Sequence, residues 1–286
     1  MSANLKKDLN KLSKRGPHRV MVGDLGFTGL PGKVYTPAEG NGVPGVAFGH
    51  DWTKTVDDYH ATLRHLASWG IAVAAPDTEI GFNPDHTGFA SDLETCLQIL
   101  AGVRLGNGNV TVSPGKLGVV GHGMGGGAAV LTAADNKKVN AVAAIYPADV
   151  APSAVAAARS LETPGLVIGS NKGDIFEAGN PAKLAYNWKG KISYREIDKG
   201  NQQGFSEDTG FQFVLGFGMP QSSARETVRG LVTGFLLHQL DKEKKYSDFS
   251  APDAEGPNLT SYWGGKLADQ AGIDRDDLHP ASPVYR

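Results

Sequence analysis

The chain has 286 residues, of which 40% are hydrophobic, so it is long enough for one large α/β domain or two small ones, each with a sizeable core. A formal net charge of −2 gives no global reason to expect a nucleic acid or an anionic membrane as partner. The single cysteine, Cys96, excludes an intrachain disulfide framework, and no stretch approaches the roughly 20 apolar residues that span a bilayer.

Residues 2–15 predict a short helix with Leu5, Leu9 and Leu12 on one face and lysines elsewhere. We interpret it as a terminal helix that caps the domain, with a weak membrane-surface contact or a partner helix as the alternative. The first twenty residues carry charges but no apolar segment behind them. A secretory signal peptide is therefore not expected, and a cytoplasmic location is the default expectation.

From residue 20 to residue 240, short apolar runs alternate with amphipathic segments. Alternating strands and helices predict a mainly parallel, twisted sheet with helices on both faces. The motif Ser223-x-x-Glu226 suggests a capping box at the start of the last long helix. The expected strands are 20–22, 33–35, 43–49, 71–75, 117–120, 141–146, 165–169 and 192–197, and the expected helices are 56–68, 89–100 and the segment from 223 onward.

The stretch Lys116–Leu131, KLGVVGHGMGGGAAVL, is the most informative part of the chain. A buried strand, a sharp glycine-rich turn and a helix of small residues follow one another, as in the nucleophile elbow G-x-S-x-G. The outer glycines, Gly121 and Gly125, are present, but the central position is Gly123. Glycine has no side chain that could attack a carbonyl group.

Taken together, these motifs resemble the α/β-hydrolase superfamily, in particular its dienelactone-hydrolase and cutinase-like polyester-hydrolase group. The resemblance runs from about Val43 to Phe249. It implies an α/β-hydrolase fold for residues 17–249. Residues 1–16 are expected to form a helical extension, and residues 250–286 a C-terminal extension that lies over the domain or reaches a partner. The motifs that carry it are GHDW (49–52), LASWGIAVAAPDT (66–78), GHGMGGGAAV (121–130), TPGLVIGSNKGDI (163–175) and KGNQQGF (199–205).

The resemblance implies a catalytic triad, and its three positions are degenerate here. An elbow serine would attack an ester, a histidine would take its proton, and an acid would orient the histidine. The serine position is Gly123, and the acid position aligns with Gly173, one residue before Asp174. The histidine falls in a G-x-x-H-x-F-like turn, where Gly200–Phe205 supplies Gln203. Glutamine has no basic nitrogen near neutral pH.

The binding half of such a site relies on backbone groups, which survive changes of side chain. The oxyanion-hole N–H groups of the family map to Met124 and to Asp51 or Trp52, and a helix dipole would assist them. Trp52, Met124 and Tyr146 are candidates for the lining of an apolar pocket, with simple core packing as the alternative.

Two histidines flank this predicted site. His50, Asp51 and Asp174 are possible substitute catalytic groups, whereas His122 is interpreted as structural. The remaining histidines lack ligand spacing, so neither a metal nor a cofactor is predicted.

Two hypotheses remain open. We favour a pseudo-hydrolase that binds an unknown small molecule or protein and acts as an accessory or regulatory factor. The alternative is an ester hydrolase with displaced catalytic residues around His50, Asp51 or Asp174.

Overall fold

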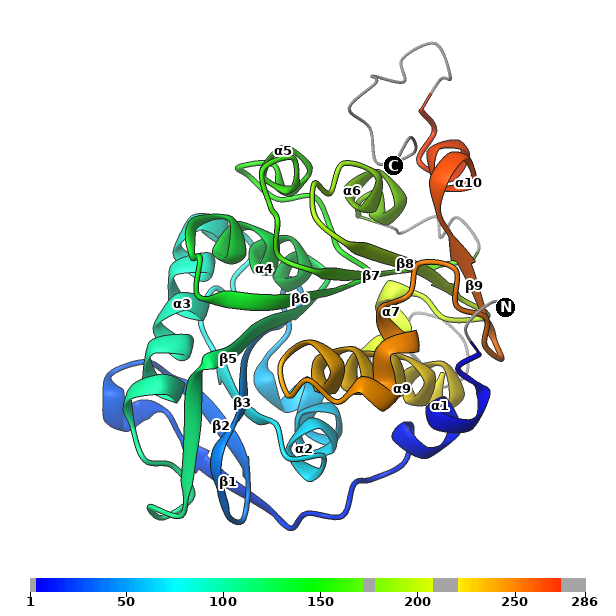
Figure 1. Cartoon of the computed structure of the whole chain (residues 1–286). Coiled ribbons are helices and arrows are strands. Elements are labelled where there is room, and N and C mark those ends of the chain that lie inside the picture. Colours follow the sequence, from blue (N-terminus) through cyan, green and yellow to red (C-terminus); the bar gives the residue numbers. More distant parts are fainter. Residues whose placement is uncertain (1–3, 172–177, 208–220, 274–286) are drawn as a thin grey trace.

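The computed structural model describes residues 4–171, 178–207 and 221–273, and within them one twisted sheet organises the chain (Figure 1). Its nine strands have the order β1-β2-β4-β3-β5-β6-β7-β8-β9. The strands are β1 (Val20–Asp24), β2 (Gly32–Pro37), β3 (Gly40–Gly49), β4 (Ala72–Pro76), β5 (Val110–His122), β6 (Val139–Ile145), β7 (Gly165–Ser170), β8 (Ile192–Ile197) and β9 (Leu259–Tyr262).

Strands β3 to β8 are parallel, and only the edges are antiparallel. β1 and β2 close one edge, and β9 pairs with β8 at the other. In the centre, β3 and β5 lie side by side, with Gly49 opposite Gly121. Because parallel strands end at the same edge of a sheet, the loop that begins at His50 lies beside the turn at Gly123.

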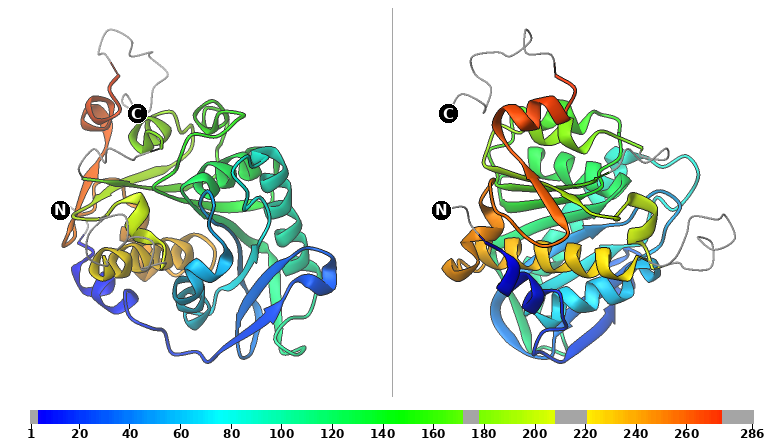
Figure 2. Two further views of the ribbon diagram at one scale, coloured as in Figure 1. Left: turned by 180° about the vertical axis from the view of Figure 1, so that it is seen from behind. Right: turned by 90° about the vertical axis from the view of Figure 1, so that its right-hand side faces the viewer.

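Helices cover both faces of the sheet, as the alternation of apolar runs predicted (Figures 1 and 2). One apolar core lies under α3 to α6 and α10, and the other lies under α1, α2, α9 and η3. The helices are α1 (Lys6–Leu12), η1 (Gly26–Thr28), η2 (Val56–Tyr59), α2 (His60–Ser68), α3 (His86–Gly102), α4 (Met124–Asp135), α5 (Ala154–Ala158), α6 (Pro181–Tyr186), α7 (Gln202–Phe205), α9 (Ser222–Gln239), η3 (Lys244–Ser250) and α10 (Gly264–Gln270).

The N-terminal helix α1 is a cap on the domain. Leu5, Leu9 and Leu12 are at most 3% exposed, and α1 packs against α9. This apolar face is therefore buried in the protein and is not exposed for a membrane surface.

The segment after residue 250 is built into the same sheet and core. β9 pairs with β8 over Tyr194–Ile197, and α10 packs on α6. The Tyr262 ring stacks against Tyr194 with ring centroids 6.1 Å apart, whereas Trp263 is 42% exposed. As far as residue 273, the C-terminal segment therefore lies on the α/β domain.

The expected start of the last long helix needs a correction. α9 begins at Ser222, one residue before the predicted capping box, and its N-cap residue Gln221 makes no side-chain capping bond. Ser223 lies inside the helix, where its carbonyl oxygen accepts a hydrogen bond from the Thr227 hydroxyl.

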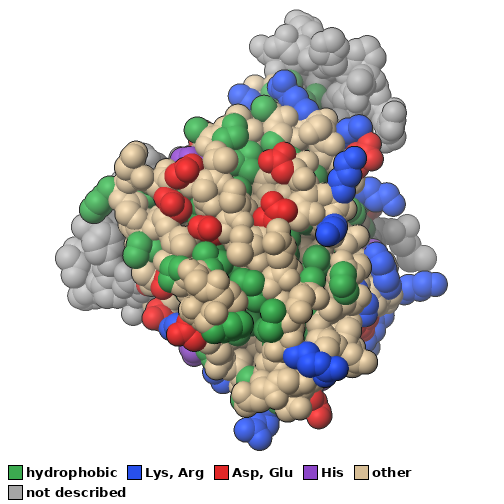
Figure 3. Space-filling view, turned by 90° about the vertical axis from the view of Figure 1, so that its left-hand side faces the viewer, with side chains coloured by type: hydrophobic (Ala, Val, Ile, Leu, Met, Phe, Trp, Pro, Cys, Tyr) green, Lys and Arg blue, Asp and Glu red, His purple; other side chains and the backbone are tan. Residues whose placement is uncertain are grey.

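The surface and the helix lengths give two further facts. Acidic, basic and hydrophobic side chains are interspersed on the face shown in Figure 3, with many of the Lys and Arg side chains toward its right-hand edge. In the part of the chain that the structure describes, no helix is long and apolar enough to cross a membrane.

Candidate functional site

The turn between β5 and α4 keeps the sharp geometry of a nucleophile elbow. Gly123 has φ 53° and ψ −118°, and its N–H donates to the Ile145 carbonyl oxygen at 3.0 Å. Side chains adopt this region only at a cost of about 1–3 kcal/mol, whereas glycine reaches it without a Cβ clash. The turn therefore keeps a positive φ at Gly123, at the position of the elbow nucleophile.

The outer glycines of the motif are required by close backbone approach. A Cβ at Gly121 would lie 1.9 Å from the Gly125 carbonyl oxygen, and one at Gly125 would lie 2.2 Å from that of Gly49. These contacts let the first turn of α4 pass directly over β3 and β5. The glycine-rich sequence therefore serves helix–strand packing.

The carboxylate of Asp51 occupies the centre of the site. Its Oδ1 accepts hydrogen bonds from the backbone N–H of Met124 at 2.9 Å and from that of Trp52 at 2.8 Å. These are two of the N–H groups that the sequence mapped to an oxyanion hole. They converge on a side-chain oxygen of this same chain, at the positive end of the α4 dipole.

The same carboxylate excludes a side chain at position 123. A Cβ built on Gly123 would lie 1.9 Å from Asp51 Oδ1 and 2.1 Å from its Cγ. Asp51 therefore fills the space into which a residue-123 side chain would extend. The glycine at 123 and the aspartate at 51 are sterically matched to one another.

The glutamine that reaches this site is Gln202, whereas the sequence singled out Gln203. The Gln202 Nε2 donates to Asp51 Oδ2 at 2.9 Å, and its Oε1 accepts from the Ala178 N–H at 3.3 Å. Gln202 is the first residue of α7, and the side chain of its N-cap residue Asn201 accepts a hydrogen bond from the Gly204 N–H at 2.8 Å. In the run G-N-Q-Q-G, the two adjacent glutamines made the sequence alignment ambiguous by one position.

Behind Asp51 lies a buried chain of hydrogen bonds. The Asp51 N–H donates to the Tyr59 hydroxyl at 3.1 Å, and the hydroxyl oxygen lies 2.7 Å from His122 Nδ1. The hydroxyl can therefore donate to an unprotonated Nδ1. Burial lowers the pKa of His122 and raises that of Tyr59, so both side chains are neutral at pH 7. His122 packs edge-on against Tyr59 and also against Phe205, which fits its structural interpretation.

His50 is not turned toward Asp51's carboxylate. Its Nδ1 lies 2.8 Å from the Asp51 carbonyl oxygen and its Nε2 lies 2.8 Å from that of Thr78, and the ring is fully buried. Both nitrogens face backbone carbonyl groups, so His50 is unsuited to act as the substitute base. Gly173 and Asp174 lie outside the described residues.

The three residues expected to line an apolar pocket do not share one surface. Met124 and Tyr146 are 2% and 1% exposed, and Tyr146 packs against His122. Only Trp52 is open, at 49% exposure, and its ring meets that of Phe82 edge-on at 5.9 Å. Trp52 and Phe82 thus form an exposed apolar rim next to Asp51.

The sheet order, the helices on both faces and the elbow at Gly123 define an α/β-hydrolase fold. Comparison with known families agrees with this architecture. The model of the PET hydrolase-like family matches residues 12–260, and the chain belongs to that family. The match extends beyond the segment on which the sequence resemblance rested.

A curated relative adds a more distant similarity. The chain is 26% identical over 167 residues to cutinase est1 of Thermobifida alba. The alignment covers 58% of this chain and 54% of the cutinase, so the chain spans about half the length of that relative.

Proposed function

We propose that this PET hydrolase-like protein is a pseudo-hydrolase that binds a small molecule or a protein segment and acts as an accessory factor. The observation that carries the proposal is the position of Asp51. Its carboxylate accepts the backbone N–H groups of Met124 and Trp52 and blocks any side chain at Gly123.

The chemistry of ester hydrolysis explains why this position matters. Stabilisation of the tetrahedral intermediate requires free N–H donors aimed at the developing oxyanion. A carboxylate that already holds both donors excludes the ester carbonyl and repels a second negative charge. In place of a histidine base, Gln202 offers an amide that cannot take up a proton near neutral pH.

The same arrangement indicates what the site would bind. An oxyanion hole is a hydrogen-bond donor, whereas the Asp51 carboxylate is an acceptor with partial exposure. Beside it lie Trp52 and Phe82, both exposed. A ligand with an aromatic or apolar body and a hydroxyl or amino group fits this combination of acceptor and rim.

The deciding experiment is steady-state hydrolysis of p-nitrophenyl butyrate by the purified full chain. We expect no turnover above a heat-denatured control. Turnover that follows the protein through purification and disappears in Asp51→Asn would contradict the proposal. It would support the second candidate, an ester hydrolase in which the partly exposed Asp51 carboxylate activates water.

A further inference from the structure

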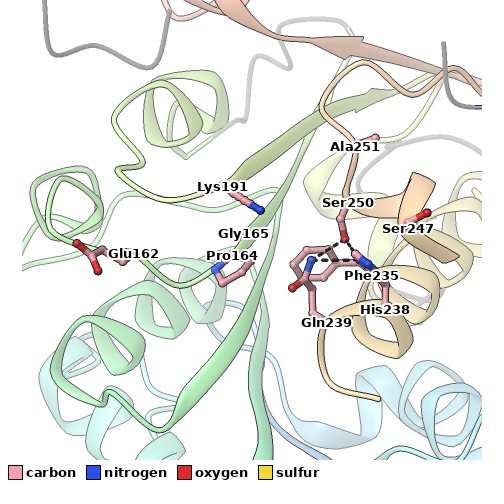
Figure 4. A pocket seen from close by; sticks show the side chains of 10 residues that line it. All are labelled: Glu162, Pro164, Gly165, Lys191, Phe235, His238, Gln239, Ser247, Ser250 and Ala251. Carbon is pink, nitrogen blue, oxygen red and sulfur yellow. Dashed lines mark hydrogen bonds between the residues drawn. The ribbon is translucent and has the colours of Figure 1, made fainter. Parts of the chain in front are cut away.

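A second polar cluster lies at the opposite end of the sheet from Gly123. It lines a cavity of about 420 Å³ at the amino ends of β7 and β8, a volume within the range of about 300–1,000 Å³ of small-molecule sites (Figure 4). The C-terminal turn of α9 contributes His238 and Gln239, and the last residue of η3 contributes Ser250. Lys191, directly before β8, faces them across the cavity.

The hydrogen-bond partners in this cluster assign donor and acceptor roles to His238 Nδ1 and Ser250 Oγ. The Gln239 Nε2 can only donate, and it lies 2.9 Å from Ser250 Oγ and 3.2 Å from His238 Nδ1. Nδ1 is therefore an unprotonated acceptor. Ser250 Oγ lies 2.7 Å from the same nitrogen, so its own O–H points at His238.

The surroundings keep the imidazole available as a base. Burial lowers the pKa of His238, and the positive charges of Lys242 and Lys191 lower it further. The ring is thus neutral at pH 7. Glu162, the carboxylate that lines the cavity, is paired with Lys189 at 2.6 Å and points away from the cluster.

We propose that Ser250 is a nucleophile activated by His238, and that the cavity accepts small activated acyl esters with their carbonyl oxygen toward Lys191. A serine hydroxyl that donates to a neutral imidazole is the arrangement that nucleophilic catalysis requires. The Lys191 ammonium supplies a positive charge where an oxyanion would develop, and Phe235 and Pro164 supply an apolar wall.

The reaction is acylation of the protein. Ser250 Oγ forms a bond to the carbonyl carbon while its proton passes to His238 Nδ1. The bond from that carbon to the leaving aryl oxygen then breaks, and the phenolate takes up the proton from the imidazole. The products are an acyl ester on Ser250 and a free phenol.

The test is labelling of the intact full chain with a fluorophosphonate probe, followed by mass-spectrometric mapping of the modified residue. We expect one label on Ser250. It should be lost in Ser250→Ala and retained in Ser247→Ala, the matched control, because Ser247 lines the same cavity. His238→Gln should slow labelling by about 100-fold or more, since general-base catalysis is typically worth 10²–10⁴.

Several results would overturn the inference. The first is a native chain that stays unlabelled while a serine esterase control is fully labelled. The second is a label that maps to another residue. The third is an unchanged rate of labelling in a His238→Gln variant whose melting temperature is also unchanged. Mapping on the native chain needs no variant to fold. The butyrate assay repeated in Ser250→Ala separates this site from the elbow: turnover that persists there contradicts the pseudo-hydrolase proposal alone.

Discussion

Replacement of Gly123 by alanine tests whether the glycine and Asp51 form one sterically matched unit. The new Cβ meets two obstacles. The backbone at φ 53° costs a side chain about 1–3 kcal/mol, and Asp51 Oδ1 stands 1.9 Å from the Cβ position. The carboxylate must therefore move, and it then loses at least one of its bonds to Met124, Trp52 and Gln202.

The magnitude follows from these two terms. A hydrogen bond to a charged group contributes about 1.5–3 kcal/mol net, with the lower end appropriate for a half-exposed carboxylate. Strain and one lost bond together predict that Gly123→Ala destabilises the fold by about 2.5–4.5 kcal/mol. In an Asp51→Ala background only the strain remains, so the same substitution should cost about 1–3 kcal/mol.

The assay is urea unfolding of the native chain, both single variants and the double variant, with the unfolding slopes compared to check a common two-state transition. We expect a coupling free energy of at least about 1 kcal/mol between positions 51 and 123. Additive effects of the two substitutions would refute the steric match. A native-like stability for Gly123→Ala would refute the retained elbow geometry as well.

Four further predictions follow from the structure. Gly123→Ser alone should remain without esterase activity, because Asp51 blocks the new hydroxyl. The combination of Gly123→Ser with Asp51→Gly, Gln202→His and Gly173→Asp is more favourable for esterase activity. Activity of the single variant in the butyrate assay would contradict this prediction. In an NMR titration, benzyl alcohol, which carries a hydroxyl donor, should shift the Trp52 indole signal more in the native chain than in Asp51→Asn. Benzyl acetate, which lacks that donor, should give an equally small shift in both proteins. Equal shifts with the two compounds in the native chain would argue against an acceptor site at Asp51. Truncation after Ala251 removes β9 and the 2.6 Å hydrogen bond from the buried Arg195 to Ser261. Calorimetry should then show a melting temperature lower by more than about 5 °C. An unchanged melting temperature would mean that β9 adds no stability. Burial and Arg229 lower the pKa of His65 from 6.5 to about 4, so the unfolded chain binds a proton first and stability is lost as pH falls from 6.5 toward 4. In urea unfolding, His65 should contribute about 1–2 kcal/mol of the stability lost between pH 7 and pH 5; His65→Gln should remove that share, and His60→Gln, exposed on the same helix, should not.

The sequence was sufficient for β1 to β8 because each of these strands has a local signature, whereas β9, at Leu259–Tyr262, was not expected. Apolar runs such as 165–169 and 192–197 correspond to β7 and β8 within one residue. The strand–glycine–helix pattern around Gly123 predicted the elbow, which has a positive φ in the structure. Boundaries that depend on tertiary contacts were less accurate, as at the start of α9, where the Ser223 and Glu226 pattern competed with a start one residue earlier.

The arrangement within the site was only partly predictable. Asp51 was singled out as a backbone donor or a substitute catalyst, yet its side chain is an acceptor for the Met124 and Trp52 N–H groups. This contact joins residues 73 positions apart, and its cause is the absence of a Cβ at Gly123. Neither residue alone indicates the pairing, since an aspartate after a strand and a glycine in a turn are both common.

The pairing also explains how the fold accommodates a glycine at position 123. An empty nucleophile position beside two N–H donors at a helix N-terminus would leave polar backbone groups poorly satisfied and a positive potential uncompensated. Asp51 supplies both the acceptor and the charge, and the Gln202 amide satisfies its second oxygen. In a hydrolase, preoriented backbone N–H donors stabilise the oxyanion of the transition state. Here the N–H groups of Met124 and Trp52 instead bind the Asp51 carboxylate of the same chain. Because the Asp51 carboxylate is then part of the folded structure, its removal should both lower stability and reopen the donor site, which makes Asp51 the residue on which stability and function are coupled.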